Sequence, residues 1–179
     1  MKIQIIGAGR LGSQIAFCCM IFLKPEIISL HDIKDLEGDI MDLVHAKNGY
    51  NSIHEEKLKT EINSEIIEAD FIVIAAGETR NDGRKHEKWL EINKKLLKNI
   101  MKEIKASATS RIIVTTNPVI EITEWAKKEY PQYDFHHSED ELLKYRDGKE
   151  LGIEILKTKG YTNFGPAMSV VEKIKELSK

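Results

Sequence analysis

The 179-residue chain contains only two cysteines, and these are adjacent, Cys18 and Cys19. Neighbouring side chains of a helix point in different directions, so the two cannot form an ordinary bridge, and a disulfide-stapled fold is excluded. We expect reduced thiols that fill the core of a cytoplasmic protein. The histidines do not form the clusters with cysteine that metal sites use, so no metal is expected. They are His31, His45, His54, His86, His136 and His137.

Long apolar runs and a strong net charge are also missing. No apolar stretch is long enough to span a bilayer, and the chain opens on a strand pattern instead of a secretory leader. The formal net charge of −2 argues against a nucleic-acid or membrane surface. Hydrophobic residues at 41% and charged residues at 31% are typical of a globular protein with one substantial core.

The most informative stretch is the start of the chain. Residues 2–6 form an apolar run with β-branched members, followed by Gly7-Ala8-Gly9-Arg10-Leu11-Gly12 and then by apolar residues at helical spacing. A strand, a glycine turn and a helix N-terminus in this order bind the diphosphate of a dinucleotide. Gly7 permits the tight turn, Gly9 leaves room for phosphate, and Gly12 lets the helix lie close to the strand. The helix then directs unpaired N–H groups at the anion.

A second strand-like run, residues 27–31, ends in Asp32. This is about the distance past the glycines at which a ribose-binding carboxylate is expected. Such a carboxylate would accept hydrogen bonds from ribose hydroxyls and repel a 2′-phosphate, so NAD is favoured over NADP. The simpler alternatives are a strand-end turn for Asp32 and a fold without a cofactor for the glycines.

Strands and helices alternate along the remaining chain. We expect helices over residues 37–46, ended by Asn48-Gly49, and over 86–104 and 119–130. The apolar runs 71–77 and 111–116 are typical of strands covered on both faces, and 57–62 and 133–136 are weaker strand candidates. Ser138 to Glu141 reads as a capping box for a helix that reaches Leu156, with weak points expected at Gly148 and Gly152. Pro166 suits the start of a last helix.

This alternation predicts an α/β fold, a Rossmann-type doubly wound parallel sheet of five or six strands with extra C-terminal helices. We expect an NAD-binding domain over residues 1–137, with the helices of residues 138–179 packed on it as the remnant of a substrate domain. Parallel strands end at one edge of a sheet, so Gly7, Asp32, Gly77 and Asn117 should meet in one crevice.

Five motifs occur in an order that resembles the lactate/malate dehydrogenase family. They are Gly7 to Gly12 with Asp32, Glu37 to Ala46, Ala75-Ala76-Gly77 with Thr79-Arg80, Val114 to Val119, and Lys159 to Phe164. The resemblance implies an NAD-dependent oxidoreductase that acts on the CH–OH group of 2-hydroxy acids. It implies that the cofactor contacts Gly7, Gly9, Arg10, Leu11, Gly12, Asp32, Ala76, Gly77 and Asn117.

The resemblance also implies roles at the substrate. Arg80 would be the mobile-loop arginine that approaches the substrate, Asn117 would lie beside the nicotinamide and the substrate oxygen, and Thr162 would line the pocket. The alternatives are a solvated loop arginine, an Asn-Pro turn and a helix-breaking threonine. Where the family has a second loop arginine this chain has His86, with Arg84 two residues earlier.

The segment between Ile120 and Ser138 carries neither the Gly-His-Gly signature nor the Asp-x-x-Arg pair of the family. Oxidation of a 2-hydroxy acid needs a base, a carboxylate that orients it and a guanidinium for the substrate carboxylate. The catalytic candidates are therefore Arg80, Arg84, His86 and Asn117. His86, His136 and His137 are the candidates for a substitute base, and surface histidines are the alternative.

Two interpretations follow. One is an NAD-dependent 2-hydroxy-acid dehydrogenase, and the other is a catalytically silent dinucleotide-binding protein that acts as a partner or regulator. In the family the acidic helix and the helices around the Lys-Gly-Tyr-Thr segment pack across a two-fold axis. We therefore expect a homodimer formed by residues 37–46 and by the helices after Ser138.

Overall fold

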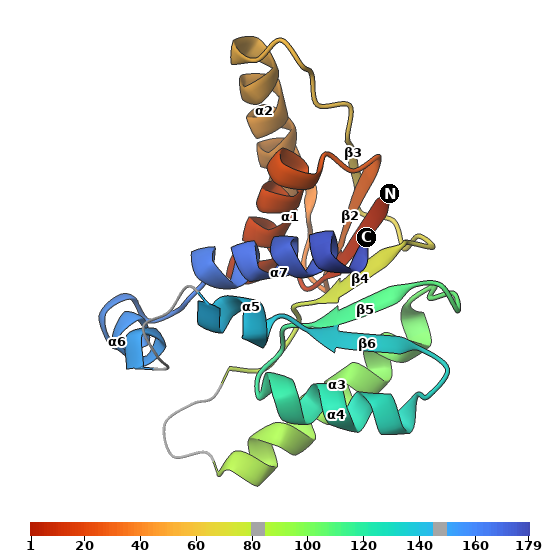
Figure 1. Cartoon of the computed structure of the whole chain (residues 1–179), viewed down its shortest axis with the longest axis vertical. Helices are drawn as coiled ribbons and strands as arrows, with labels where there is room; N and C mark the ends of the chain where they lie inside the picture. Colours follow the sequence, from red (N-terminus) through yellow and green to blue (C-terminus); the bar gives the residue numbers. More distant parts are fainter. Residues whose placement is uncertain (80–84, 145–149) are drawn as a thin grey trace.

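A parallel sheet with helices on both faces forms the centre of the molecule (Figure 1). The computed structural model describes residues 1–79, 85–144 and 150–179, and within them six strands lie in the order β3-β2-β1-β4-β5-β6. All neighbouring pairs are parallel, as expected for a Rossmann-type sheet. The strands are β1 (Lys2–Ile6), β2 (Ile27–His31), β3 (Glu61–Asn63), β4 (Phe71–Ile74), β5 (Arg111–Val114) and β6 (Asp134–His137).

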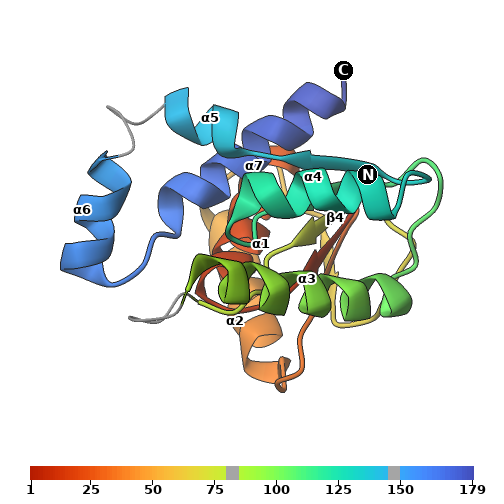
Figure 2. The same ribbon diagram turned by 90° about the horizontal axis from the view of Figure 1, so that it is seen from below.

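Two hydrophobic cores cover the two faces of the sheet. On one face pack α1 (Arg10–Leu23), α2 (Glu37–Ile53) and α7 (Phe164–Leu177), and on the other pack α3 (His86–Glu103) and α4 (Val119–Glu129) (Figure 2). Alternate residues of each central strand enter opposite cores: Val73 faces the first, whereas Ile72 and Ile74 face the second. Burial on both faces explains why these strands read as continuous apolar runs.

The helix α2 is longer than the sequence predicts, because it continues through Asn48-Gly49 to Ile53. Its last turn is held by contacts from the following segment. The Lys57 ammonium donates to the carbonyl oxygens of Asn51 and His54, the latter at 2.7 Å. These bonds satisfy carbonyl groups that a helix end leaves without partners, so the Asn-Gly pair does not terminate the helix.

The C-terminal part has two separate helices where the sequence predicts one helix with weak points at Gly148 and Gly152. The structure has α5 (Glu139–Lys144) and α6 (Glu150–Lys159), and α6 does not continue the axis of α5 (Figures 1 and 2). The expected capping box is replaced by an ion pair, because the buried Glu141 carboxylate lies 2.7 Å from the Lys173 ammonium of α7. Burial lowers the pKa of Lys173, but the hydrogen bonds that its ammonium donates to Glu141 and Glu176 outweigh this effect and raise that pKa overall.

The helix α7 packs across α1 and shares its core (Figure 1). Ala167, Val170 and Ile174 of α7 are buried in the same cluster as Ile15 of α1. The cysteines of α1 are free and buried, and burial raises the pKa of the Cys18 and Cys19 thiols. In the described ranges, no helix is long and apolar enough to cross a membrane.

Candidate functional site

The glycine turn after β1 is built by close backbone contacts. Gly7 has φ +97°, and its N–H donates to the carbonyl oxygen of His31 at 2.7 Å. A Cβ atom added to Gly7 would lie 2.3 Å from the backbone nitrogen of Ala76, and one added to Gly12 would lie 1.8 Å from the carbonyl oxygen of Gly7. These two glycines are therefore required for the turn and for the approach of α1 to the sheet.

Gly9 differs from its two neighbours in the motif. It is exposed, it precedes the first residue of α1, and a Cβ atom added to it would meet nothing within 4 Å. Ser13 N–H is bonded to the Gly9 carbonyl, whereas the N–H groups of Arg10 to Gly12 precede the first helical hydrogen bond. The first turn has no acidic residue. Open space in front of a helix N-terminus fits a diphosphate.

Asp32 lies directly beside this turn. Its Oδ2 accepts a 2.7 Å hydrogen bond from the N–H of Ala8, and its Oδ1 accepts a 3.3 Å bond from the N–H of Lys34. A second carboxylate, Asp39, accepts from Ser13 Oγ at 3.0 Å and from Lys34 Nζ at 2.7 Å. The hydrogen bond from Lys34, helped by that from Ser13, lowers the pKa of Asp39. The carboxylate predicted for the ribose thus lies at the glycine turn.

The Lys-Gly-Tyr-Thr segment approaches the turn from the C-terminal part. The Arg10 guanidinium lies 4.4 Å from the ring centroid of Tyr161, and the Lys159 ammonium lies 4.5 Å from the same centroid. Thr162, the next residue, is half-buried. The sequence does not indicate that Lys159 and Arg10 both contact the ring of Tyr161, because 149 positions separate the two cations in the chain. Two cations therefore lie beside the N-terminus of α1.

The ends of β4 and β5 form the other side of the crevice. A Cβ atom on Gly77 would lie 2.4 Å from Cγ2 of Thr116, and Thr116 Oγ1 donates to the Ala76 carbonyl at 2.6 Å. Ala76 N–H donates to the carbonyl of Ile6, the last residue of β1, at 2.8 Å. Asn117 follows Thr116 and is exposed. An unbroken series of contacts therefore links Asp32, the glycine turn, Gly77 and the residue before Asn117.

Of the charged catalytic candidates, the structure describes His86 but neither arginine. Arg80 and Arg84 lie outside the described residues. His86, the first residue of α3, has Nε2 at 2.9 and 3.1 Å from the two carboxylate oxygens of Glu121 in the first turn of α4. Its ring also lies edge-on to Trp89, with the centroids 6.0 Å apart. No local sequence pattern indicates Glu121 as a partner of His86, because the pair depends on how α3 and α4 pack against each other.

The two histidines at the end of β6 have local partners. Nε2 of His136 lies 2.8 Å from Oδ1 of Asp134, although not in hydrogen-bond geometry. Nδ1 of His137 accepts a 3.4 Å bond from the N–H of Glu139. Both contacts lie within a few residues of the strand end, as expected for structural histidines.

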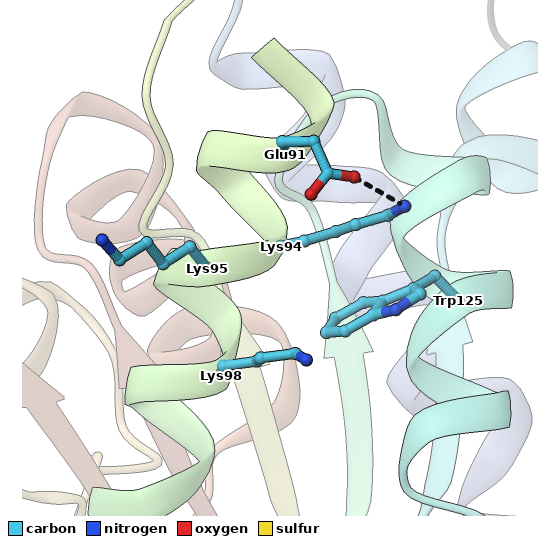
Figure 3. Close-up of a pocket in the computed structure, with 5 residues that line it drawn as sticks. All are labelled: Glu91, Lys94, Lys95, Lys98 and Trp125. Carbon is cyan, nitrogen blue, oxygen red and sulfur yellow. Dashed lines mark hydrogen bonds and ion pairs between the residues drawn. The ribbon is translucent and has the colours of Figure 1, made fainter. Parts of the chain in front are cut away.

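A pocket of about 260 Å³ lies between α3 and α4, on the face of the sheet opposite α1. Figure 3 shows Lys94 and Lys98 on either side of the Trp125 indole, while Lys95 points away from it. Lys94 is 3.3 Å from Glu91, and Lys98 is 2.9 Å from Glu129, which raises the pKa of Lys98 by its hydrogen bond. Two of the three lysines that line the pocket thus already have carboxylate partners.

Among residues 1–79, 85–144 and 150–179, no group of three or more His, Cys, Asp or Glu could hold a metal ion.

A parallel sheet, a glycine turn, an open helix N-terminus and a carboxylate after β2 define a Rossmann-type dinucleotide-binding protein. Residues 1–134 match the family model described as lactate/malate dehydrogenase, NAD binding domain. The chain therefore belongs to the lactate/malate dehydrogenase family, and the cofactor of its domain is NAD. The space at Gly9 and the carboxylate of Asp32 fit the diphosphate and a ribose of this cofactor.

The curated relatives include an L-lactate dehydrogenase from Fervidobacterium nodosum, 36% identical over 126 residues. That match covers 69% of this chain but 40% of the relative, so the chain spans less than half of its length. The malate dehydrogenase from Archaeoglobus fulgidus is 27% identical over 227 residues, covering 98% of this chain and 76% of the relative. A solved structure of the A. fulgidus malate dehydrogenase in complex with NADH has a TM-score of 0.78 and 26% identity, with the same coverage.

Proposed function

We propose that the protein binds NAD across the carboxyl ends of its strands and acts as an oxidoreductase on the CH–OH group of 2-hydroxy acids. The diphosphate would lie at Gly9 on the N–H groups of Arg10, Leu11 and Gly12, with the adenosine ribose at Asp32. The nicotinamide half would extend towards Ala76, Gly77 and Asn117. The observation that carries the proposal is the open space at Gly9 between two glycines that allow no side chain.

NAD supplies the hydride acceptor or donor of this chemistry when it is bound. The protein must then hold the substrate carboxylate and move the hydroxyl proton. Arg80 and Arg84 would pair with the carboxylate, and the Asn117 amide would bond to the substrate oxygen. His86 would move the proton: with Nε2–H donating to Glu121, its lone pair lies on Nδ1. Glu121 would then orient the imidazole.

A catalytically silent dinucleotide-binding protein is the second candidate, and one observation favours it. The alignment with the A. fulgidus malate dehydrogenase runs over 227 residues, more than the 179 of this chain. Part of that relative, between matched segments, therefore has no counterpart here. In this case NAD binding would regulate contact with a partner.

We further propose that the protein is a cytoplasmic homodimer. Its helices after residue 138 would form a unit packed on the NAD-binding domain of residues 1–137. The dimer contact would use residues 37–46 of α2 and the helices after Ser138. Met41 on α2 is 64% exposed, and Ile153 and Leu156 on α6 are about half exposed, so a second copy would bury apolar surface there.

The deciding experiment combines calorimetric NADH binding with an NADH oxidation assay on pyruvate, oxaloacetate and other 2-oxo acids. The oxidoreductase proposal predicts binding with turnover, and a loss of about 10²- to 10⁴-fold in kcat/KM for His86→Gln. His54→Gln, which changes an exposed histidine after α2, is the matched control. Binding without turnover on any 2-oxo acid would select the silent protein, and unchanged turnover in His86→Gln would remove His86 as the base.

A further inference from the structure

Asn93 is a polar residue in the buried face of α3, with only 1% of its surface exposed. A buried amide is destabilising unless its hydrogen bonds are satisfied. Oδ1 of Asn93 accepts from the N–H of Glu78 at 2.8 Å. Nδ2 donates to the carbonyl oxygens of Glu78 at 3.2 Å and of Asn117 at 2.8 Å. The Asn93 side chain thus bonds to backbone groups of two separate segments.

The two segments follow adjacent parallel strands. Glu78 comes after Gly77 at the end of β4, and Asn117 comes after Thr116 at the end of β5. Thr116 also joins these segments, because its Oγ1 donates a 2.6 Å bond to the Ala76 carbonyl. Asn93 and Thr116 together therefore set the separation of the two strand ends.

The order of the strands indicates which half of the cofactor these ends face. The glycine turn follows β1, and Asp32 follows β2, on one side of β1. The strands β4 and β5 lie on its other side. A dinucleotide whose diphosphate lies at the central turn, with one ribose at Asp32, must place its other nucleoside against β4 and β5.

We infer that Asn93 is a positioning residue for the nicotinamide half of NAD. It acts through the backbone of Glu78 and Asn117, which it holds where the nicotinamide nucleoside binds. Without its two donor bonds, the carbonyl of Asn117 would lose a buried partner and that of Glu78 would lose one of its donors, so both segments would shift. The segments of Glu78 and Asn117 would then have to be ordered again when NAD binds, which would weaken its affinity. This inference rests on the NAD site of the proposed function.

The test compares NADH with ADP-ribose, which lacks the nicotinamide, by calorimetry. Asn93→Asp keeps the acceptor and the shape but removes both donors, and Asn93→Ala removes the side-chain bonds. We expect the Kd for NADH to rise about tenfold or more in both variants, and that for ADP-ribose to change by less than about twofold. The matched control is Thr123→Val on α4: Thr123 is equally buried, and its hydroxyl donates to the Val119 carbonyl, away from the two strand ends. It should change neither Kd.

A pH series separates positioning from loss of packing. The carboxyl introduced by Asn93→Asp gains an O–H donor when it is protonated, so NADH affinity should partly recover as the pH falls. No such recovery is expected for Asn93→Ala. Trp89→Phe removes another donor to the same Glu78 carbonyl, at 2.7 Å, and should weaken NADH in the same direction even if the Asn93 variants do not fold.

Equal losses for NADH and ADP-ribose would show a general structural role and overturn the inference, as would unchanged NADH binding in the Asn93 variants. With the Asn93 variants unfolded, unchanged NADH binding in Trp89→Phe would overturn it as well. Failure of the unmodified protein to bind either compound would instead contradict the NAD site itself.

Discussion

The backbone N–H of Ala8, inside the glycine turn, donates a 2.7 Å hydrogen bond to Oδ2 of Asp32, at the end of the neighbouring strand. The carboxylate proposed to bind the ribose is therefore attached to the turn proposed to bind the diphosphate. Oδ1 accepts the longer bond, 3.3 Å, from Lys34 N–H. This weaker bond makes Oδ1 the oxygen more available to a ribose hydroxyl.

Replacing Asp32 should weaken NAD and relax the choice of cofactor. Asp32→Ala removes a charged acceptor, which should weaken NAD by about 1.5–3 kcal/mol. It also removes the charge that repels a 2′-phosphate, so NADP should bind relatively better. Titrations with both cofactors measure this, with Asp35→Asn in the same loop as the control. Equal losses for NAD and NADP would contradict a ribose role for Asp32.

The three glycines of the turn should respond differently to substitution. Gly9→Val places a side chain in open space, so the melting temperature should stay within a few degrees of the unmodified protein while NADH binding is lost. Gly12→Val forces a Cβ into the Gly7 carbonyl and should destabilise the fold. Thermal unfolding and NADH fluorescence measure both effects. If Gly9→Val bound NADH with unchanged affinity, the diphosphate would not lie there.

The proposed dimer predicts a mass near twice 20.5 kDa in light scattering at micromolar concentration. Met41→Asp places a charge in the proposed contact of α2 and should shift the protein towards the monomer. Ile120→Asp changes an exposed apolar residue of α4, outside that contact, and should leave the mass unchanged. A monomer for the unmodified protein, or equal effects of the two substitutions, would refute this interface.

Acid should lower the free energy of unfolding, because it protonates the Asp39 carboxylate beside the glycine turn. The pKa of Asp39 is lowered from 3.8 by the hydrogen bonds from Lys34 and Ser13. A lowered pKa means that this contribution is present above pH 3.8 and is lost as the pH falls through the lower pKa of the folded state. Because the pair is partly exposed, we expect less than about 1 kcal/mol.

Urea unfolding of the unmodified protein and of Asp39→Asn, from neutral pH to about pH 3, measures this contribution. The difference in the free energy of unfolding should shrink as the pH falls. Asp42→Asn, an exposed acid one turn away, is the control. A difference that stays constant down to the lowest pH would show that the charge of Asp39 does not contribute.

Local patterns were sufficient to predict most of the fold. The apolar runs ending at Ile6, Ile74 and Val114 are buried on both faces, and Gly7, Gly9 and Gly12 occupy the turn that their spacing predicts. The end of α2 could not be predicted, because it depends on Lys57 reaching back to carbonyls of the last turn. Glu141 likewise has the spacing of a capping residue, but its partner is Lys173 on another helix.

The candidate site was predictable only where its residues are adjacent in the chain. Asn93 falls within a predicted helix, but its partners could not be predicted, because they lie 15 and 24 residues away and are backbone groups. Tyr161 belongs to a motif, yet its contact with Arg10 depends on how the C-terminal part, with α7 packed against α1, meets the glycine turn. Such contacts follow from tertiary packing, which no local pattern records.

An amide NMR titration of the protein with NADH tests most directly whether the diphosphate binds at the glycine turn. We expect the largest shifts at the N–H groups of residues 9–12, followed by those near Asp32. The same residues should respond to ADP-ribose. Unchanged amides in this turn at saturating NADH, or shifts confined to the pocket of Lys94, Lys98 and Trp125, would contradict binding at the turn.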